Sequence, residues 1–307
     1  MDAKVFFVVN PVSAGKKTVK EWPSFEKQFK EKGLKFDWAF TDYPEHATSI
    51  TREVLKSGYD LVVSVGGDGT LNEVLNGFFE MNNPINPKAR LAVFSRGTGS
   101  DFIKSLGIKK GFGDFYSVLQ RNNVQKFDVG RATFCKESGE EVNKLFLNIA
   151  DVGLGAETTR LVNKTKKHLK GFFAFLVGAM LTIFKYQNKS ITIEIDGQQV
   201  KSGTMNSVII ANAKYFGGGM YISPKSKADD GILDIIVIGD LSKLELIRNF
   251  HLIYKGKHLT HPKITTYQGK QIKVISEPVG LLELDGEQLG TAPAYFEIIP
   301  QAINLLV

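Results

Sequence analysis

The chain has 307 residues, of which 43% are hydrophobic and 23% charged, and it carries a net charge of +7. This composition excludes a disordered or fibrous protein, and the length suits two globular domains. Cys135 is the single cysteine, which excludes an intramolecular disulfide and a cysteine metal cluster. The positive charge is compatible with an anionic partner such as a nucleotide, nucleic acid or acidic membrane surface, and equally with plain solubility. The first residues lack the features of a signal peptide, so we expect a cytoplasmic protein.

The first 130 residues alternate strand-like and helix-like segments. The predicted strands cover residues 4–9, 35–40, 61–65 and 91–94, and the predicted helices cover 19–32, 47–56 and 70–80. Repeated alternation of this kind predicts a doubly wound parallel sheet with helices on both faces. We assign it to an α/β domain of residues 1–128.

The character of the sequence changes after Asp128. Segments rich in β-branched residues are separated by Asp-Gly or glycine-rich turns, as in antiparallel β structure; they cover residues 190–195, 204–211, 233–238, 272–275 and 281–284. We assign residues 129–300 to a second, mostly β domain. The final apolar strand, within residues 301–307, has little left to pair with nearby and is predicted to return to the first domain.

The longest apolar run covers residues 171–184, and its 14 residues are too few to span a bilayer. Lysines crowd both ends of this run. A core helix whose flanking lysines reach water is the simpler interpretation, and an interfacial helix is the alternative.

Small, polar or glycine-rich segments follow four predicted strands, at residues 10–17, 41–42, 66–70 and 95–101. Ligands of open parallel sheets bind at the carboxyl ends of the strands, where helix N-termini converge. Any one such loop is explained by the residues that turns and helix caps require, but four such loops together favour a nucleotide or phosphate cleft. The first loop misses the Walker A pattern because Asn10 replaces a glycine, and the third misses the dinucleotide pattern because Leu71 replaces its last glycine.

The third loop, Gly66 to Thr70, ends a buried strand. Its glycines allow backbone N–H groups to approach an anion, and Thr70 is predicted to cap a helix whose positive end points at that anion. Phosphates would repel Asp68 unless a divalent cation bridged the two, so the segment predicts Mg²⁺.

This loop and its continuation, Leu71 to Gly77, resemble the signature of the diacylglycerol kinase catalytic family, which includes bacterial lipid kinases and sphingosine kinases. NAD kinases share the first five residues, so the following Asn-Glu-Val-Leu-Asn-Gly carries much of the discrimination. Further matches occur in the expected order at residues 10–16, 97–102, 151–156, 224–234 and 285–287. The resemblance implies an N-terminal α/β domain of the NAD kinase and diacylglycerol kinase type and a C-terminal β-sandwich-like domain.

The resemblance also implies an activity, the transfer of the ATP γ-phosphate to a lipid hydroxyl, with diacylglycerol as the first candidate acceptor and phosphatidic acid as its product. By the same resemblance, the nucleotide site is lined by Asn10, Thr41, Gly66, Gly67, Asp68, Gly69, Thr70, Leu71, Asn72 and Thr98. Glu287 is the implied general base, and Asp285 positions it or helps to hold Mg²⁺.

A second, structural Mg²⁺ site is implied at Asp230, together with the backbone carbonyls of Lys227 and Ile232. Both acidic motifs have simpler interpretations. Residues 282–289 are also typical of a tight hairpin, as at Asp196-Gly197, and residues 229–231 are typical of a turn before a strand.

Two residues depart from the family pattern. Ser100 replaces a common asparagine, which puts a contact of that side chain in doubt, and Arg96 replaces a small or apolar residue and could reach phosphate.

The implied partner is a lipid at the inner face of the cell membrane, contacted peripherally and without nucleic acid. The cluster Phe172, Phe173, Phe175 and Leu176 is a candidate for that contact or for an acyl-chain pocket. The oligomeric state stays open, a homodimer included. Two alternative functions remain, a kinase of NAD or a similar small metabolite and a nucleotide-binding regulator that no longer transfers phosphate.

Overall fold

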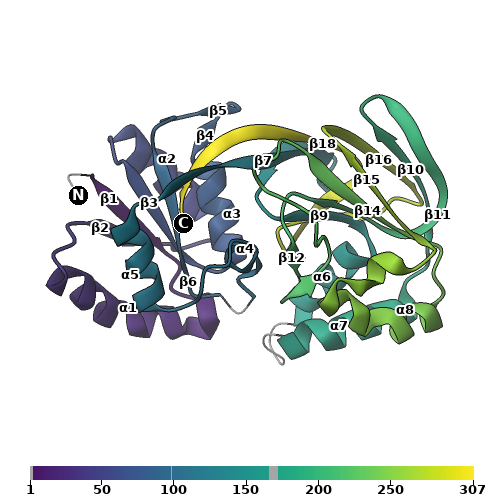
Figure 1. Ribbon diagram of the computed structural model, residues 1–307, viewed down its shortest axis with the longest axis horizontal. Coiled ribbons are helices and arrows are strands. Elements are labelled where there is room, and N and C mark those ends of the chain that lie inside the picture. Colours follow the sequence, from purple (N-terminus) through teal and green to yellow (C-terminus); the bar gives the residue numbers. More distant parts are fainter. Residues whose placement is uncertain (1–2, 98, 166–171) are drawn as a thin grey trace. The chain divides into compact units, whose positions relative to one another are not determined.

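The computed structural model describes residues 3–97, 99–165 and 172–307, and the side chains of residues 165 and 172–175 lie outside the described part (Figure 1). The chain forms two compact units. Unit 1 consists of residues 1–127 and 301–307, and unit 2 of residues 128–300.

Unit 1 alternates strands and helices along the chain. Its elements are β1 (Val5–Val9), α1 (Ser13–Glu31), β2 (Asp37–Phe40), α2 (His46–Lys56), β3 (Leu61–Gly66), α3 (Asp68–Gly77), β4 (Phe79–Glu80), β5 (Asn83–Pro84), β6 (Arg90–Ser95), α4 (Asp101–Ser105) and α5 (Phe112–Arg121). The sheet has the order β2-β1-β3-β6, all parallel. Asn304 and Leu305, near the end of the last strand, pair in parallel with Arg90 and Leu91 of β6.

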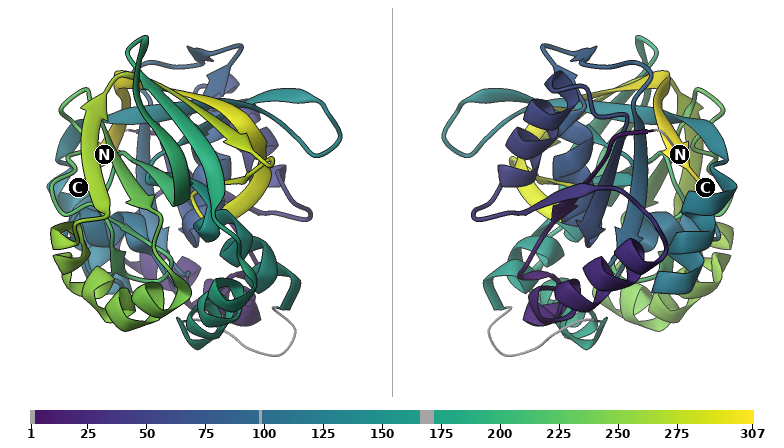
Figure 2. Two further views of the ribbon diagram at one scale, coloured as in Figure 1. Left: turned by 90° about the vertical axis from the view of Figure 1, so that its right-hand side faces the viewer. Right: turned by 90° about the vertical axis from the view of Figure 1, so that its left-hand side faces the viewer.

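Both faces of this sheet are buried, which explains why its strands are continuous apolar runs. Phe7 of β1 packs with Trp22 and Phe29 of α1 and with Phe115 of α5 on one face. The other face is covered by α2 and α3, which pack on each other (Figure 2). Loops at the carboxyl ends of β1, β2, β3 and β6 are therefore held between two helical layers.

Unit 2 is built mainly from antiparallel strands. Its elements are β7 (Val124–Cys135), β8 (Glu141–Phe146), β9 (Ile149–Gly153), α6 (Leu154–Thr165), α7 (Phe172–Lys185), β10 (Lys189–Ile195), β11 (Gln198–Ala211), β12 (Tyr215–Phe216), β13 (Met220–Tyr221), β14 (Leu233–Gly239), α8 (Lys243–Asn249), the 3₁₀ helices η1 (Phe250–Lys255) and η2 (Lys257–Thr260), β15 (Ile264–Gly269), β16 (Gln271–Glu277), β17 (Leu281–Leu284) and β18 (Glu287–Leu306). Strands β7 and β18 carry the chain between the units.

The strands of unit 2 enclose a core and present a second apolar face. One path runs β15-β14-β11-β10-β16-β18, while β9 pairs with β11 and with β17. Side chains such as Ala150, Val152 and Leu282 point into the core, and Ile149 and Ile209 belong to a separate apolar cluster with residues of η1 and η2. Helices α6, α7 and α8 lie side by side along unit 2 (Figure 1).

Helix α3 differs from its prediction at both ends. It begins at Asp68 with Gly67 at the N-cap position, so the prediction that Thr70 caps it is wrong. Residues Phe79 and Glu80, predicted as its last turn, pair instead with Asn83 and Pro84 in a short hairpin. Because the helix begins at Asp68, Thr70 lies inside the first turn, and Gly67 at the N-cap position has no side chain that could cap it.

Helix α7 covers the long apolar run. No helix of the described residues is long and apolar enough to cross a membrane. Ala179 and Ile183 are buried, but Val177, Leu181 and Phe184 are 41%, 49% and 60% exposed, so the helix is not simply a core helix. The predicted contacts of Phe172, Phe173 and Phe175 fall on side chains outside the described part.

Gly77 lets α3 lie close against α2. A Cβ at Gly77 would lie 2.4 Å from Cβ of Thr51 and 2.8 Å from the carbonyl oxygen of Thr48. We expect Gly77→Ala to lower the free energy of unfolding by about 1–3 kcal/mol, because the two helices must separate. Gly113→Ala is the matched control, since a Cβ at this position of helix α5 would meet no atom within 4 Å. Urea denaturation would contradict this packing if the two variants changed stability alike.

Candidate functional site

Two loops of unit 1 pack backbone against backbone at the ends of β3 and β6. The N–H of Arg96 donates to the carbonyl of Gly66 at 2.6 Å. A Cβ at Gly97 would lie 2.4 Å from Cα of Gly67, and a Cβ at Gly66 would lie 2.3 Å from Oγ1 of Thr70. The packing of the two loops therefore requires glycine at 66 and 97, whether or not a phosphate binds there.

Asn10 links the first loop to helix α3. Its Nδ2 donates to Oγ1 of Thr70 at 2.9 Å, and its Oδ1 accepts the N–H of Val12 at 3.0 Å. Thr41 lies beside this position, because its N–H donates to the carbonyl of Val9 at 2.9 Å. The structure thus brings together three of the residues predicted to line the nucleotide site.

Asp68 holds the loop that follows β6. Its Oδ2 accepts the N–H of Asp101 at 3.1 Å, and its Oδ1 accepts the N–H of Phe102 at 3.3 Å. Burial raises the pKa of Asp68, while these N–H groups and the charge of Lys110 act to lower it. Lys110, which the sequence did not single out, donates to the carbonyls of Gly97 and Gly99 at 3.3 and 3.2 Å. Magnesium binding by Asp68 stays a prediction.

The remaining predicted nucleotide contacts differ in accessibility. Leu71 is only 3% exposed, so its side chain belongs to the core. Asn72 accepts a hydrogen bond from Nδ2 of Asn76 at its backbone carbonyl, at 2.9 Å. Gly69 lies in the first turn of α3. Thr98 lies outside the described residues.

The two departures from the family pattern have local partners. Arg96 forms an ion pair with Glu21, and its guanidinium lies 4.9 Å from the centre of the Phe25 ring. This side chain is therefore engaged within unit 1 and does not extend freely toward a phosphate. Ser100 is buried, with its hydroxyl bonded to that of Ser95, so serine fills this position as part of the loop packing.

Asp285 and Gly286 form a two-residue hairpin turn in unit 2. Their φ angles are 47° and 89°, the left-handed values of a type I′ turn, and Leu284 pairs with Glu287 across it. The Asp285 carboxylate accepts the N–H groups of Leu147, Asn148 and Ile149 at 3.0, 2.9 and 3.0 Å. Its evident role is to anchor the turn on the segment that leads into β9.

A second turn of the chain makes the same kind of contact. Asp196 and Gly197 have φ angles of 49° and 81°, and the Asp196 carboxylate accepts the N–H groups of Lys270 and Gln271 at 3.0 and 2.9 Å. An aspartate in this position therefore needs no catalytic explanation. The contacts of Asp285 are therefore those of a hairpin turn. A role of Asp285 in positioning Glu287 or in holding Mg²⁺ stays a prediction.

Glu287 is the first residue of β18 and is exposed. Its Oε2 accepts a hydrogen bond from Nδ2 of Asn163 on α6 at 3.2 Å. The anchored turn fixes its backbone, while its carboxylate lies at a surface that a substrate hydroxyl can reach. The role of Glu287 as a general base stays a prediction.

Asp230 lies among other carboxylates. Its Oδ1 accepts the N–H of Ile232 at 3.2 Å, and Gly231 donates to Asp128 at 2.6 Å. Burial raises the pKa of Asp230, and the nearby charges of Asp234, Asp128 and Asp229 raise it further. A bound cation would relieve this repulsion, and binding of Mg²⁺ by Asp230 with the carbonyls of Lys227 and Ile232 stays a prediction.

Within residues 3–97, 99–165 and 172–307, no three histidine, cysteine, aspartate or glutamate side chains are arranged to hold a metal ion. A site at Asp230 would therefore depend on backbone carbonyls and water.

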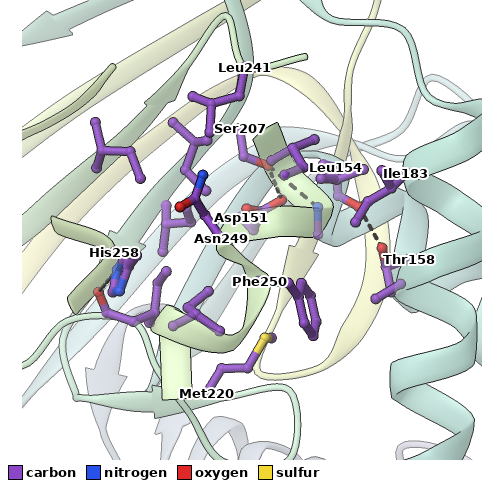
Figure 3. A pocket seen from close by; sticks show the side chains of 18 of the residues that line it. Asp151, Leu154, Thr158, Ile183, Ser207, Met220, Leu241, Asn249, Phe250 and His258 are labelled. Carbon is purple, nitrogen blue, oxygen red and sulfur yellow. Dashed lines mark hydrogen bonds between the residues drawn. The ribbon is translucent and has the colours of Figure 1, made fainter. Parts of the chain in front are cut away.

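An apolar cavity of about 100 Å³ lies within unit 2 (Figure 3). Its lining comes from β9, α6, α7, β11, the β12–β13 hairpin, β14, α8, η1, η2 and β15. Most of the lining residues are aliphatic or aromatic, and the polar ones are Asp151, Thr158, Ser207, Asn249 and His258. Figure 3 shows Asp151 and Ser207 side by side, with His258 at another part of the wall.

Asp151 is the buried acid of this cavity, only 1% exposed. Its Oδ1 accepts the N–H of Ala156 at 3.0 Å and the hydroxyl of Ser207 at 3.3 Å. Burial raises its pKa to about 7, while these donors act to lower it. Burial lowers the pKa of His258 to about 4. Both shifts favour the uncharged form of the side chain, as expected in an apolar cavity.

Glu283 lies directly opposite Asp151 on the neighbouring strand and is equally buried. Burial raises its pKa well above the usual range, and the charge of Asp151 raises it further. Its Oε2 accepts the N–H of Gly286 at 2.8 Å, which joins this acid to the Asp285 turn. Because the carboxyl groups of Asp151 and Glu283 are both buried and adjacent, we expect at least one of them to be protonated at neutral pH.

Asp151 lies within a motif that the resemblance matches, whereas Glu283 and the cavity lie outside every predicted site. The signal was an acidic residue inside an otherwise apolar strand, at Ile149 to Val152 and again at Leu281 to Leu284. Such a residue is expensive to bury and therefore points to a special environment.

Comparison with known proteins gives two family matches. Residues 4–132 match the model of the diacylglycerol kinase catalytic domain, and residues 148–307 match the YegS C-terminal NAD kinase beta sandwich-like domain. The chain is 26% identical over 305 residues to a diacylglycerol kinase of Staphylococcus carnosus, covering 99% of this chain and 95% of the relative.

Solved structures show the same fold. A diacylglycerol kinase from Bacillus anthracis superposes with a TM-score of 0.70 at 24% identity, covering 99% of this chain and 96% of that chain. An NAD kinase from Archaeoglobus fulgidus in complex with ATP superposes with a TM-score of 0.51 at 14% identity, covering 99% and 93%. The predicted fold class, an N-terminal α/β domain of this type and a C-terminal β-sandwich-like domain, is confirmed.

The two Asp-Gly turns provide a matched test of the Asp285 anchor. We expect Asp285→Ala to lower the free energy of unfolding by about 2–4 kcal/mol more than Asp196→Ala. The φ angles are alike, but the N–H groups that Asp285 satisfies are buried, whereas those of Lys270 and Gln271 lie at exposed residues that water can reach. Equal losses in urea denaturation would show that Asp285 is not such an anchor.

The raised pKa of Asp151 predicts a pH-dependent stability. Between pH of about 4 and 7 the unfolded chain releases this proton while the folded chain keeps it, so the wild type loses stability as pH rises. Asp151→Asn removes this loss, and its stability relative to wild type should rise by up to about 1.4 kcal/mol per pH unit in that window. Urea midpoints measured across the window test this, with Asp240→Asn, at an exposed carboxylate, as the control. Parallel profiles for Asp151→Asn and wild type would refute it.

Proposed function

Because the chain belongs to the family that joins a diacylglycerol kinase catalytic domain to a YegS-type C-terminal domain, we propose that it transfers the γ-phosphate of ATP to a lipid hydroxyl. Family membership supports a kinase. The observation that favours a lipid acceptor is the cavity of unit 2, whose lining is almost wholly apolar and whose few polar groups include the paired Asp151 and Ser207.

The cavity, at about 100 Å³, suits the end of a hydrocarbon chain better than a nucleotide. An apolar wall gains free energy by burying methylene groups, whereas a dinucleotide would need polar partners for its ribose and phosphate groups. Asp151 and Ser207 could bond a hydroxyl or ester group next to the chain, because one is an acceptor and the other can donate or accept. Diacylglycerol, which would give phosphatidic acid, is the acceptor that we propose first.

In unit 1 the proposed nucleotide site consists of Asn10, Thr41 and the glycine loop from Gly66 to Gly69. Backbone N–H groups and the N-terminus of α3 favour phosphate there. Lys110, which reaches the carbonyls of Gly97 and Gly99, adds positive charge to the same loops. Magnesium, when bound, would neutralise charge on the phosphoryl oxygens.

In unit 2 Glu287 would accept the proton of the attacking lipid hydroxyl. The Asp285 anchor and the hydrogen bond from Asn163 limit the motion of this carboxylate, so its orientation is set before the acceptor arrives. The proton moves from the lipid oxygen to the Glu287 carboxylate as the oxygen bonds to phosphorus and the bond to ADP breaks.

A panel assay with labelled ATP tests the substrate class. Diacylglycerol, phosphatidylglycerol, sphingosine and undecaprenol would be offered in mixed micelles, beside soluble NAD. We expect label in the lipid fraction, with diacylglycerol preferred. Label in NAD alone would establish the small-metabolite alternative, and ATP binding without transfer to any acceptor would establish the regulator.

Glu287→Gln tests the base. We expect kcat to fall by about 10²–10⁴-fold while the affinity for ATP stays within about twofold, because the amide keeps the shape but cannot take the proton. Glu141→Gln is the matched control, since Glu141 is also an exposed glutamate at the first position of a strand in unit 2. Turnover of Glu287→Gln at the wild-type rate would remove Glu287 from the mechanism.

A further inference from the structure

Four exposed apolar side chains gather on two adjacent helices of unit 2. On α7, Val177, Leu181 and Phe184 have the spacing of one helical stripe and are 41%, 49% and 60% exposed. On α8, Leu244 is 72% exposed. Isolated exposed apolar residues are ordinary on protein surfaces, but a stripe of three continued by a fourth on the next helix is an apolar patch.

A direct contact places the ends of the two helices together. The ammonium group of Lys243, at the start of α8, bonds the backbone carbonyl of Phe184 in the last turn of α7. Leu244 follows Lys243 in the chain, so its backbone lies one residue from this contact. We call the surface formed by Val177, Leu181, Phe184 and Leu244 the α7–α8 face.

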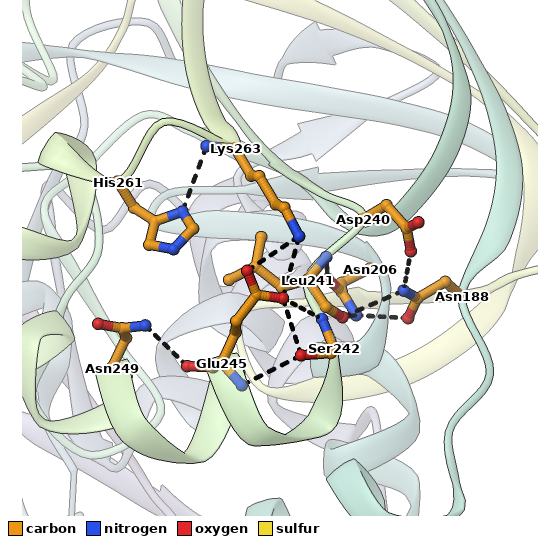
Figure 4. Close-up of polar contacts among 9 residues, drawn as sticks. All are labelled: Asn188, Asn206, Asp240, Leu241, Ser242, Glu245, Asn249, His261 and Lys263. Atoms are coloured by element: carbon orange, nitrogen blue, oxygen red, sulfur yellow. Dashed lines mark hydrogen bonds and ion pairs between the residues drawn. The ribbon is translucent and has the colours of Figure 1, made fainter.

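Cationic side chains border this face. Lys185, Lys243 and Arg248 are all exposed. The acidic residues on the neighbouring loop and helix have partners of their own: Asp240 accepts from Asn188, and Glu245 pairs with Lys263 (Figure 4). The Lys263 contact and the capping bonds of Ser242 lower the pKa of Glu245 to about 2. The border is therefore net positive.

We propose that the α7–α8 face docks the protein on an anionic phospholipid surface. Apolar side chains of this size enter the boundary between headgroups and acyl chains, while lysine and arginine reach lipid phosphates from the edge of the patch. A protein partner would need a complementary surface, whereas a bilayer needs only exposed apolar groups ringed by cations. The proposal deepens the proposed lipid-kinase function by naming the membrane contact, and it differs from the predicted contact through Phe172 and Phe173.

Vesicle co-sedimentation without ATP or diacylglycerol tests docking separately from catalysis. The full-length chain should bind vesicles that contain phosphatidylglycerol and bind neutral phosphatidylcholine vesicles at least about tenfold more weakly. The variant Leu181→Ser/Phe184→Ser should weaken binding to phosphatidylglycerol vesicles by at least about tenfold. Ile275→Ser/Tyr295→Ser is the matched control, because these residues of β16 and β18 are 38% and 50% exposed and lie outside the α7–α8 face.

Charge and folding are checked in the same experiment. Lys185→Glu should weaken binding to anionic vesicles and leave the weak binding to neutral vesicles unchanged, and added salt should reproduce this effect. Thermal denaturation reports whether each variant folds, and phosphorylation of detergent-dispersed lipid reports whether the catalytic function survives. The proposal is overturned if folded Leu181→Ser/Phe184→Ser binds like wild type, or if this variant instead abolishes a dimer seen by sedimentation velocity without vesicles. Loss of catalysis in every variant, with docking intact, would count only against the proposed function.

Discussion

One carboxylate organises the candidate site of unit 2. Asp285 accepts three consecutive backbone N–H groups, from Leu147 to Ile149, at the entrance to β9. These groups are buried and would otherwise lack partners, which makes the bond costly to lose. Glu287 lies two residues after this anchor, and Asp151 lies two residues after its last partner. The candidate base and the buried acid of the cavity are therefore held by the same interaction.

Asp68 plays a similar structural role in unit 1, because its carboxylate accepts two backbone N–H groups of the loop after β6. Asp68 and Asp285, two of the acids predicted for the site, are thus also loop anchors. Loss of activity on substituting either one would not by itself identify a catalytic residue, since a displaced loop has the same consequence. Glu287 differs in its exposure and in its partner, because its exposed carboxylate accepts a hydrogen bond from the side-chain amide of Asn163.

Sequence periodicity was sufficient to predict the parallel sheet of unit 1, because strands buried on both faces are continuous apolar runs and the helices between them repeat. It could not locate the start of α3, where Gly67 and not Thr70 precedes the helix. Nor could it foresee that Arg96 pairs with Glu21, since long-range partners depend on how the elements pack. The cavity was missed for the same reason: its lining comes from many separate segments, and only the acids in apolar strands at Asp151 and Glu283 gave a local signal.

Helix α7 is apolar on two sides: one side lines the cavity and the other is exposed at the surface. Ala179 and Ile183 line the cavity, whereas Leu181 and Phe184 face solvent. A helix that served only the core would need polar residues on its outer side, because exposed large apolar groups favour association and lower solubility. A bilayer that covered the outer side would remove this cost. The same helix would then separate the membrane from the cavity, so an acyl chain would have to cross only one helical layer between the two.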